Sequence, residues 1–409
     1  MSFAREEPVQ HEIQAHYRAL RAIRTRKALE RSALWAEIGG EVTRVLEGVE
    51  RGDRTAAAGP PAAVPRPRDR ALRAVAWNIQ RGARLDDLRA AVVAPPFADA
   101  DLFLLSEVDV GLGRSGNRNV ARELADALGM SYAFGVSYLA LTDDFGDDAG
   151  GRENTLALSG AAVISRYPIG RVENIDLPEI RDKFHSSEKR LGKKRALLAE
   201  IALPDGPLAV AACHLDSNAS PAQRARQLGG VLDSIDRSGV ARALVGGDFN
   251  TSTYDVSSTL ALARDLLHKL LVTGFRATVD QYLTPEKRYE RPVFDLLRAR
   301  AFAVDGFNDR ALGTYFYDLT DPYVLTRSQK LVGRLLTRLL VRLLRPWNGC
   351  VPARLDWFAG RNLSPVAATV ARPRAAADGR PLSDHAAVIV DVAVQKPAAD
   401  APAPPAPRR

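Results

Sequence analysis

The sequence predicts a mixed α/β fold in which β-sheets are covered by helices. Short apolar runs of strand length recur along the chain, and amphipathic segments of helical length separate some of them. The chain has 409 residues, 46% of them hydrophobic and 26% charged, which is enough for one large domain with extensions and a sizeable core.

Charge and cysteine content narrow the class of protein. Lysine and arginine number 57 against 49 acidic residues, a net charge of +8, which favours polyanions or anionic surfaces as partners. The two cysteines, Cys213 and Cys350, supply neither a disulfide framework nor a Cys-rich zinc site. The start does not resemble a secretory leader, and no apolar stretch reaches the length of a membrane span. We therefore expect a cytoplasmic protein.

The N-terminal part predicts a helical extension over residues 1–56. Within residues 8–50, apolar residues from Trp35 to Val49 recur at spacings of three and four, with charges between them. This apolar stripe can either pack on the main domain or mediate helical self-association with a second copy. Both alternatives stay open.

Two Pro/Ala-rich segments delimit the main domain. Residues 57–70 predict an extended linker, and residues 395–409 predict a disordered tail. The main domain therefore spans residues 71–394.

Eight apolar runs within this domain predict strands. They are LRAVAWNI (72–79), ADLFLLSEV (100–108), GAAVISRYPI (160–169), RALLAEIAL (195–203), LAVAACHL (208–215), ARALVGGDF (241–249), ARLDWFAG (353–360) and HAAVIVDVAV (385–394). Several are apolar throughout, which predicts burial on both faces. Residues 119–130 and 221–239 predict helices between them.

Most of these predicted strands end at uncommon polar residues. They are Asn78, Glu107, His214, Asp248, Asn250, Asp356, Asp384 and His385. Each alone could cap a turn or be a satisfied core group. Together they suggest a bound cation, because burying several ionisable groups is costly unless something offsets their desolvation. Oxygen and imidazole donors suit Mg²⁺ or Mn²⁺.

Seven motifs occur in an order that gives these residues a more specific context. They are WNIQRG, LLSEVD, ISRYPI, CHLDSN, GGDFN, RLDWF and SDHAAV. In this order they resemble the endonuclease/exonuclease/phosphatase superfamily of metal-dependent phosphohydrolases, over residues 71–394. The resemblance implies a four-layered α/β sandwich, in which two packed mixed β-sheets are flanked by helices.

The resemblance also implies a metal site and a water site. Glu107 would ligate the divalent metal, with Asn78 and Asp384 close to it. Asp248 would orient or deprotonate the attacking water, and Asn250 would hold the water or a phosphate oxygen.

Three further residues would act on the phosphate, again by resemblance. Asp356 would hydrogen-bond His385 and fix its tautomer, so that His385 contacts the phosphate. His214 would be a phosphate contact or the acid for the leaving group. In-line displacement at phosphorus needs charge stabilisation, an activated water and a hydrogen-bonding group on the leaving side.

Basic residues near the site are candidate substrate contacts. Arg114, in a glycine-rich segment after Glu107, could bind a substrate phosphate, although a plain turn is the alternative. The segment 181–195 predicts an electropositive lip that includes Lys193 and Arg195, or else a solvated loop.

An insertion at about residues 326–347 helps to decide which class of substrate the protein acts on. Leucines form one face of its predicted helix, while arginines recur at near four-residue intervals. Such a basic amphipathic helix suits peripheral contact with an anionic membrane through residues 330–345, or packing on the domain.

Three functions remain as hypotheses. The leading one is a metal-dependent hydrolase of a phosphodiester, with nucleic acid slightly favoured by the basic composition. The alternative is a phospholipid or inositol-phosphate phosphodiesterase or phosphatase at a membrane surface. The third is a catalytically silent binding module on the same scaffold.

Overall fold

The structure is a computed structural model of the chain, and it describes residues 5–54, 71–143, 151–251, 274–320 and 333–394. It also describes residues 264, 267, 268, 324–326, 328 and 329. The expected linker and tail lie outside the described residues, as do residues 330–332 of the expected insertion.

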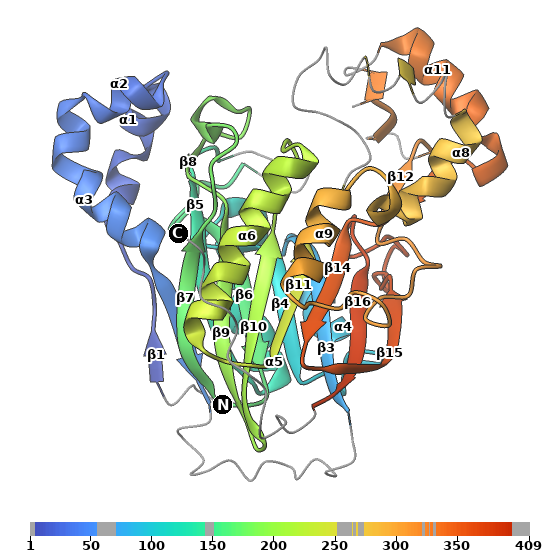
Figure 1. The fold of residues 1–409 in the computed structure, drawn as a ribbon. Coiled ribbons are helices and arrows are strands. Elements are labelled where there is room, and N and C mark those ends of the chain that lie inside the picture. Colours follow the sequence, from blue (N-terminus) through green and yellow to red (C-terminus); the bar gives the residue numbers. More distant parts are fainter. Residues whose placement is uncertain are drawn as a thin grey trace.

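The larger of two main sheets has nine strands (Figure 1). In spatial order they are β1 (Arg5–Glu7), β2 (Val49–Asp53), β5 (Ser131–Ala140), β6 (Leu158–Ser165), β4 (Leu102–Val110), β3 (Leu72–Arg81), β16 (Ala387–Ala393) and β15 (Ser364–Ala371), with β8 (Arg190–Gly192) paired to β5. β3 and β4 are parallel, whereas their outer neighbours β16 and β6 run antiparallel to them.

The smaller main sheet has five strands. Their order is β14 (Asp356–Arg361), β11 (Ala243–Asp248), β10 (Gly206–His214), β9 (Arg195–Leu203) and β7 (Ile169–Asp176). β10 and β11 are parallel, and the other pairings are antiparallel.

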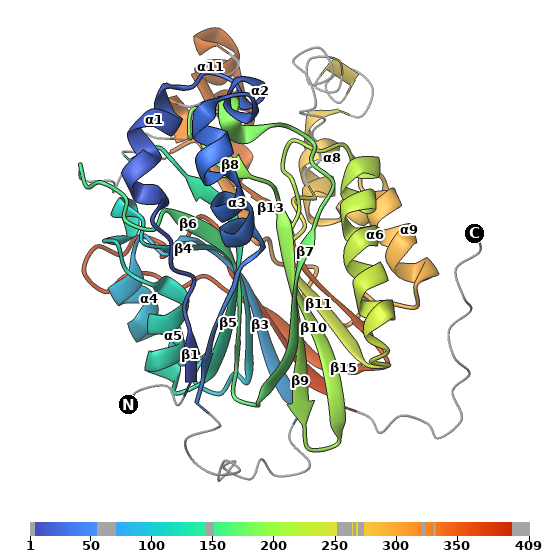
Figure 2. The same cartoon turned by 90° about the vertical axis from the view of Figure 1, so that its left-hand side faces the viewer.

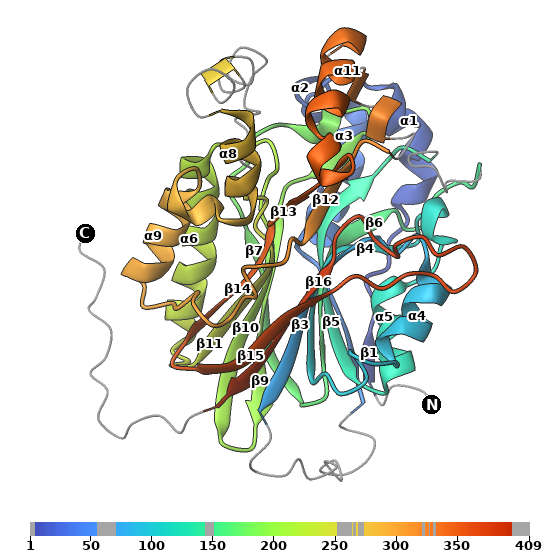
Figure 3. The ribbon, with the colours of Figure 1, turned by 90° about the vertical axis from the view of Figure 1, so that its right-hand side faces the viewer.

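The two sheets pack face to face and are flanked by helices. Side chains such as Leu104 from the large sheet and Val210 from the small sheet form the core between them. α4 (Leu85–Val92) and α5 (Val120–Leu128) cover the large sheet, and α6 (Pro221–Ser238) and α9 (Arg291–Ala299) cover the small one (Figures 2 and 3). This arrangement confirms the four-layered sandwich.

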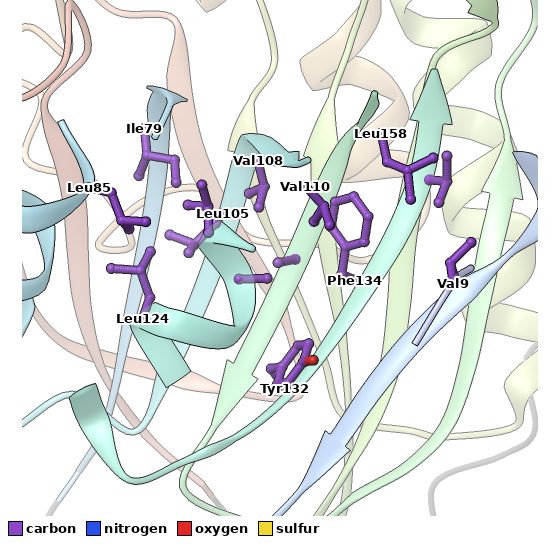
Figure 4. Packing of buried hydrophobic residues seen from close by; sticks show 14 of the residues in the cluster. Val9, Ile79, Leu85, Leu105, Val108, Val110, Leu124, Tyr132, Phe134 and Leu158 are labelled. Carbon is purple, nitrogen blue, oxygen red and sulfur yellow. The ribbon is translucent and has the colours of Figure 1, made fainter. Parts of the chain in front are cut away.

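A second core fills the space between the large sheet and its helices. Leu105 and Phe134 from the sheet lie in one cluster with Leu85 of α4 and Leu124 of α5 (Figure 4). All eight expected strands and both expected helices are present, and the structure adds further strands to both sheets.

The N-terminal segment contains helices, as expected, but it also extends the large sheet. Its helices are α1 (Tyr17–Ala22), α2 (Arg26–Glu30) and α3 (Ala33–Glu47). After α3 the chain forms β2, which pairs with β5 and with β1. The apolar stripe of α3 is buried in the core beside the large sheet, so packing, not self-association, accounts for it.

The insertion forms an arm between β12 (Tyr315–Asp318) and β13 (Cys350–Ala353), which pair with each other. Its described helix, α11 (Arg334–Leu343), is shorter than expected. Leu340 and Leu344 pack into a small separate core that also contains Val351. Within the described residues, no helix has both the length and the apolar character needed to cross a membrane.

Candidate active site

The site forms where strands of both main sheets end. The register of the small sheet places His214 beside Asp248 and Asp248 beside Asp356, across β10, β11 and β14. We call His214, Asp248 and Asp356 the site row. Since β10 and β11 are parallel, their carboxyl ends meet at one edge of the sheet, as the polar residues at the strand ends predict.

Two glycines explain how β11 enters the site row. A Cβ atom on Gly247 would lie 2.1 Å from the backbone oxygen of Cys213, and the φ of Gly247 is +134°. A Cβ atom on Gly246 would lie 2.4 Å from the ring of Phe358. Side chains at these positions would push β11 away from its neighbours, so the GGDFN motif is needed for close strand packing.

Asp248 is the hub of the site. Its carboxylate accepts hydrogen bonds from the side chain of Asn78 at 3.2 Å and from both the backbone and the side chain of Asn250, at 2.8 and 3.1 Å. Nε2 of His214 lies 3.4 Å from the same carboxylate, and Nε2 of His385 lies 3.9 Å from it. Burial raises the pKa of Asp248 above its ordinary value, against the opposing effect of His385.

His385 is held by Asp356 across the interface between the sheets. The two side chains are 2.8 Å apart, from Nδ1 to Oδ2. Thr314 accepts a hydrogen bond from the backbone N–H of Asp356, and the ring of Tyr315 lies 5.1 Å from the His385 ring. Burial alone would lower the pKa of His385, but the carboxylates of Asp356 and Asp248 outweigh it and raise this pKa well above its usual range.

Glu107 reaches the site from a β-bulge in β4. Its φ is +52°, and the register of β4 with both neighbouring strands shifts at this residue. Bulges redirect side chains, and backbone strain of this kind clusters at functional sites. Burial would raise the pKa of Glu107, but Arg81, at 3.7 Å, and His214, at 4.0 Å, outweigh it and lower this pKa.

The carboxylates of Glu107 and Asp384 fit a divalent cation. Glu107 accepts no hydrogen bond within the described part of the chain; the Arg81 guanidinium lies 3.7 Å from its carboxylate and Nε2 of His214 lies 4.0 Å from it. Asp384 is exposed at the surface, yet desolvation within the site raises its pKa, with further contributions from Glu107 and Asp248 in the same direction. Two oxygen donors that repel each other match the ligand chemistry of Mg²⁺. The amide of Asn78 donates to Asp248 and accepts from the backbone N–H of Gln80.

A second group of possible ligand atoms suits a cation less well. Asp248, Asp356 and His385 place donor atoms within 4.8 Å of one another. However, the hydrogen bond to Asp356 and the raised pKa of His385 indicate a protonated imidazole, which repels a metal ion. This group is better explained as an oriented proton-bearing pair.

The pKa of His214 is lowered to about 4, chiefly by burial and secondarily by Lys194, so its imidazole is neutral at pH 7. Its Nε2 lies between the carboxylates of Asp248 and Glu107. His214 therefore lies between Glu107, the expected metal ligand, and Asp248, the residue expected to act on the attacking water.

The three basic candidates from the sequence are each held in ion pairs with carboxylates. Arg114 is buried and makes ion pairs at 2.6 Å with Asp109 and Glu188, so its guanidinium is already occupied. Lys193 and Arg195 both pair with Asp176 at the end of β7. These ion pairs, and not a contact with substrate, explain why basic residues occur at these three positions.

Lys194 belongs to the expected electropositive lip but was not singled out as a substrate contact, and it is the lysine of this segment that is coupled to the site. The electrostatic partners of its ammonium include the carboxylates of Asp216, Glu107 and Asp248. Burial is the main cause that lowers the pKa of Lys194 to about 8. The alternation of side chains along an extended segment separates Lys194 from its two neighbours, and this signal was present in the sequence.

Comparisons with known proteins identify the family of the chain. A model of the Endonuclease/Exonuclease/phosphatase family matches residues 75–385. No curated protein matches the sequence.

Several solved structures are similar. An endonuclease/exonuclease/phosphatase from Beutenbergia cavernae is 18% identical with a TM-score of 0.46, over 79% of this chain and 71% of that chain. D. rerio TDP2 complexed with a single-strand DNA product is 13% identical with a TM-score of 0.42, over 80% of this chain and 100% of that one. The human Nocturnin catalytic domain is 15% identical with a TM-score of 0.42, over 80% and 94%. Because the family model spans most of the sequence and all eight candidate residues at the strand ends, the chain belongs to the endonuclease/exonuclease/phosphatase family.

Proposed function

We propose that the chain is a divalent-metal-dependent hydrolase that cleaves a phosphodiester by in-line attack of an activated water. Members of its family are typically phosphoester hydrolases. The observation that carries the proposal is the site row itself, in which Asp248 lies between His214 and the Asp356–His385 pair.

Asp248 is the proposed base for the attacking water. A general base works best when its pKa lies nearer the working pH, and burial shifts the pKa of Asp248 in that direction. Asn250 and Asn78 fix the orientation of this carboxylate through their hydrogen bonds. The water would be held between Asp248 and the phosphorus.

His385 is the proposed positive contact to the phosphate. Asp356 orients its ring and favours the charged form, so the imidazolium stabilises negative charge that develops on phosphate oxygens. His214 is neutral at pH 7 because its pKa is about 4, which suits a hydrogen-bonding phosphate contact better than an acid for the leaving group.

Glu107 and Asp384, with Asn78 beside them, would hold Mg²⁺ or Mn²⁺. When bound, the ion would supply Lewis-acid stabilisation of a phosphate oxygen. Oxygen donors favour these hard cations over softer metals.

The test compares two substrates side by side with Asp248→Ala as the blank. We expect Mg²⁺-dependent cleavage of single-stranded nucleic acid or of phospholipid vesicles by the wild type and none by the variant. The basic composition supports nucleic acid. Absence of turnover on both substrates and on a soluble diester would return the chain to the class of binding modules.

The surface of α11 favours a second candidate, a phosphodiesterase acting at an anionic membrane. Leu335 is 81% exposed and Leu339 is 48% exposed, one helical turn apart, and Arg338 and Arg342 lie exposed beside them. Because Leu340 packs inward, core packing does not explain the outer leucines. Apolar and cationic side chains on one face suit the boundary between anionic head groups and acyl chains.

The arm that bears α11 is joined to the site at both ends. Tyr315 of β12 forms a bridge with His385, and β13 leads directly into Asp356. A membrane contact through α11 would therefore lie close to substrate entry.

Vesicle binding tests this second candidate. The double variant Leu335→Ser/Leu339→Ser should weaken binding to phosphatidylglycerol vesicles about tenfold or more, since each leucine contributes about 1.5–3 kcal/mol when buried. Val366→Ser, at an exposed position on β15, is the matched control and should bind as the wild type does. Equal binding by all three proteins would remove α11 as a docking surface.

A further inference from the structure

Lys194 lies next to the site row at the start of β9. In the antiparallel register of β9 and β10, Leu197 faces Ala212. Because the two strands are antiparallel, the start of β9 lies at the same edge of the sheet as the end of β10, where His214 belongs to the site row. The backbone oxygen of Lys194 accepts a hydrogen bond from the N–H of Leu177 at 3.1 Å, which fixes this segment against the end of β7.

The neighbours of Lys194 point the other way. Lys193 and Arg195 both make ion pairs with Asp176. Consecutive side chains of an extended segment project to opposite sides, so Lys194 projects away from Asp176. Its electrostatic partners accordingly include Glu107 and Asp248 in the site.

Lys194 faces carboxylates without pairing closely with any of them. Asp216 is already bound by Lys183, at 3.4 Å, and by the backbone N–H of Asn218, at 2.9 Å. Within the described part of the chain, Lys194 makes no ion pair with a carboxylate. The side chain is only partly exposed, so its ammonium remains in the site with donors to spare.

We propose that the Lys194 ammonium binds a non-bridging oxygen of the substrate phosphate. This inference rests on the proposed function of the site. The carboxylates of Glu107, Asp248, Asp356 and Asp384 would repel an incoming phosphate, and a lysine without an ion pair beside them offsets that repulsion. An ammonium donates up to three charge-assisted hydrogen bonds to phosphate oxygens.

The first test measures phosphate binding without turnover. Inorganic phosphate with Mg²⁺ should raise the thermal unfolding midpoint of the wild-type protein and of Lys193→Ala, because Lys193 pairs with Asp176 outside the site. Lys194→Ala should lose most of this effect, and Lys194→Arg should restore part of it. The unfolding midpoint without phosphate shows whether each variant is folded.

The second test uses bis(p-nitrophenyl) phosphate, a soluble diester. Lys194→Ala should lower kcat/KM by roughly 10- to 100-fold, as expected for a lost charge-assisted hydrogen bond, while Lys193→Ala stays within about twofold of the wild type. Recovery in Lys194→Arg separates a need for positive charge from a need for side-chain packing.

The outcomes separate this inference from the proposed function. If phosphate stabilises the wild type through Lys194 but no phosphoester is cleaved, the hydrolase proposal fails and the phosphate contact stands. If the wild type cleaves the diester and Lys194→Ala equals it in kcat/KM and in the phosphate effect, the hydrolase proposal stands and the role of Lys194 is overturned. A wild type that phosphate does not stabilise also contradicts the contact.

Discussion

Two clusters of buried charged residues lie near Glu107, and they are built differently. In the first, Arg114 is held between Asp109 and Glu188 by short ion pairs. In the second, the site row and His385, Asp248 is approached by two histidines at 3.4 and 3.9 Å. One buried carboxylate oxygen in each cluster, Oε2 of Glu188 and Oδ1 of Asp356, lacks a hydrogen-bond partner within the described residues, but that of Glu188 lies 3.5 Å from the guanidinium of Arg190.

The difference separates structural charges from functional ones. In the Arg114 cluster the guanidinium is shared by two carboxylates, so no ligand is needed to offset its desolvation. The site row leaves carboxylate oxygens and a lysine incompletely paired, and a bound metal and phosphate would complete their interactions. Removing a charge should therefore affect stability in the first cluster and activity in the second.

The largest expected effect concerns the metal side of the site. Glu107→Gln should lower kcat/KM on a soluble diester by about 100- to 1,000-fold and raise the Mg²⁺ concentration needed for half-maximal activity, because an amide is a weaker ligand than a carboxylate. Removal of metal with EDTA should abolish turnover in the wild type, and Mg²⁺ should restore it. An unchanged Mg²⁺ requirement in Glu107→Gln would exclude this residue as a ligand.

Arg114→Met should have the opposite effect to Glu107→Gln: the protein should lose stability but keep most of its activity per folded molecule. It leaves Asp109 buried without its ion-pair partner, while Glu188 keeps Arg190 and Arg81, and breaking such a buried pair costs about 3–5 kcal/mol of unfolding free energy. Chemical denaturation measures this cost. A stable variant with weakened substrate binding would instead support Arg114 as a phosphate contact.

Asp356→Asn should change the pH dependence of activity. Asp356 raises the pKa of His385, so the wild type keeps the charged imidazole at neutral pH and loses it only as pH rises through that raised pKa. Without the carboxylate, this pKa should fall, and activity should decline at lower pH than in the wild type. A profile of kcat/KM against pH with an unmoved alkaline limb would contradict the assignment.

The smallest effect is expected at an exposed ion pair. Arg298 pairs with Asp295 on the surface of α9, where both side chains are more than half exposed. Arg298→Ala should change the unfolding free energy by less than about 1 kcal/mol and leave kcat/KM unaltered. A larger change would show that charge pairing at the surface matters as much as in the Arg114 cluster.

The fold was largely predictable because its buried strands are apolar throughout. The runs that became β3, β4, β10 and β11 identify both sheets, and the polar residues at their ends identify the site. β2, with the sequence VERGD, carries no such pattern, because it owes its place in the sheet to pairing with β5.

The basic residues were harder to predict because ion pairs depend on contacts distant in the sequence. Arg114 meets Glu188 across a separation of 74 residues, which its local glycine-rich context does not indicate. Lys194 differs from Lys193 in its partners, and it is the pairing of β9 with β7 that brings Lys193 and Arg195, but not Lys194, to Asp176.

Measuring activity and stability together in Asp248→Asn is the most direct test of the difference between the Arg114 cluster and the site row. We expect a loss of kcat/KM of about 1,000-fold on a soluble diester, because the base is removed, with an unfolding midpoint equal to or above that of the wild type. Stability is kept because burial raises the pKa of Asp248, so ionised Asp248 is a cost to the folded state at pH 7 and the amide relieves it. Unchanged turnover, or a lowered midpoint with full activity per folded molecule, would show that Asp248 serves stability and not catalysis.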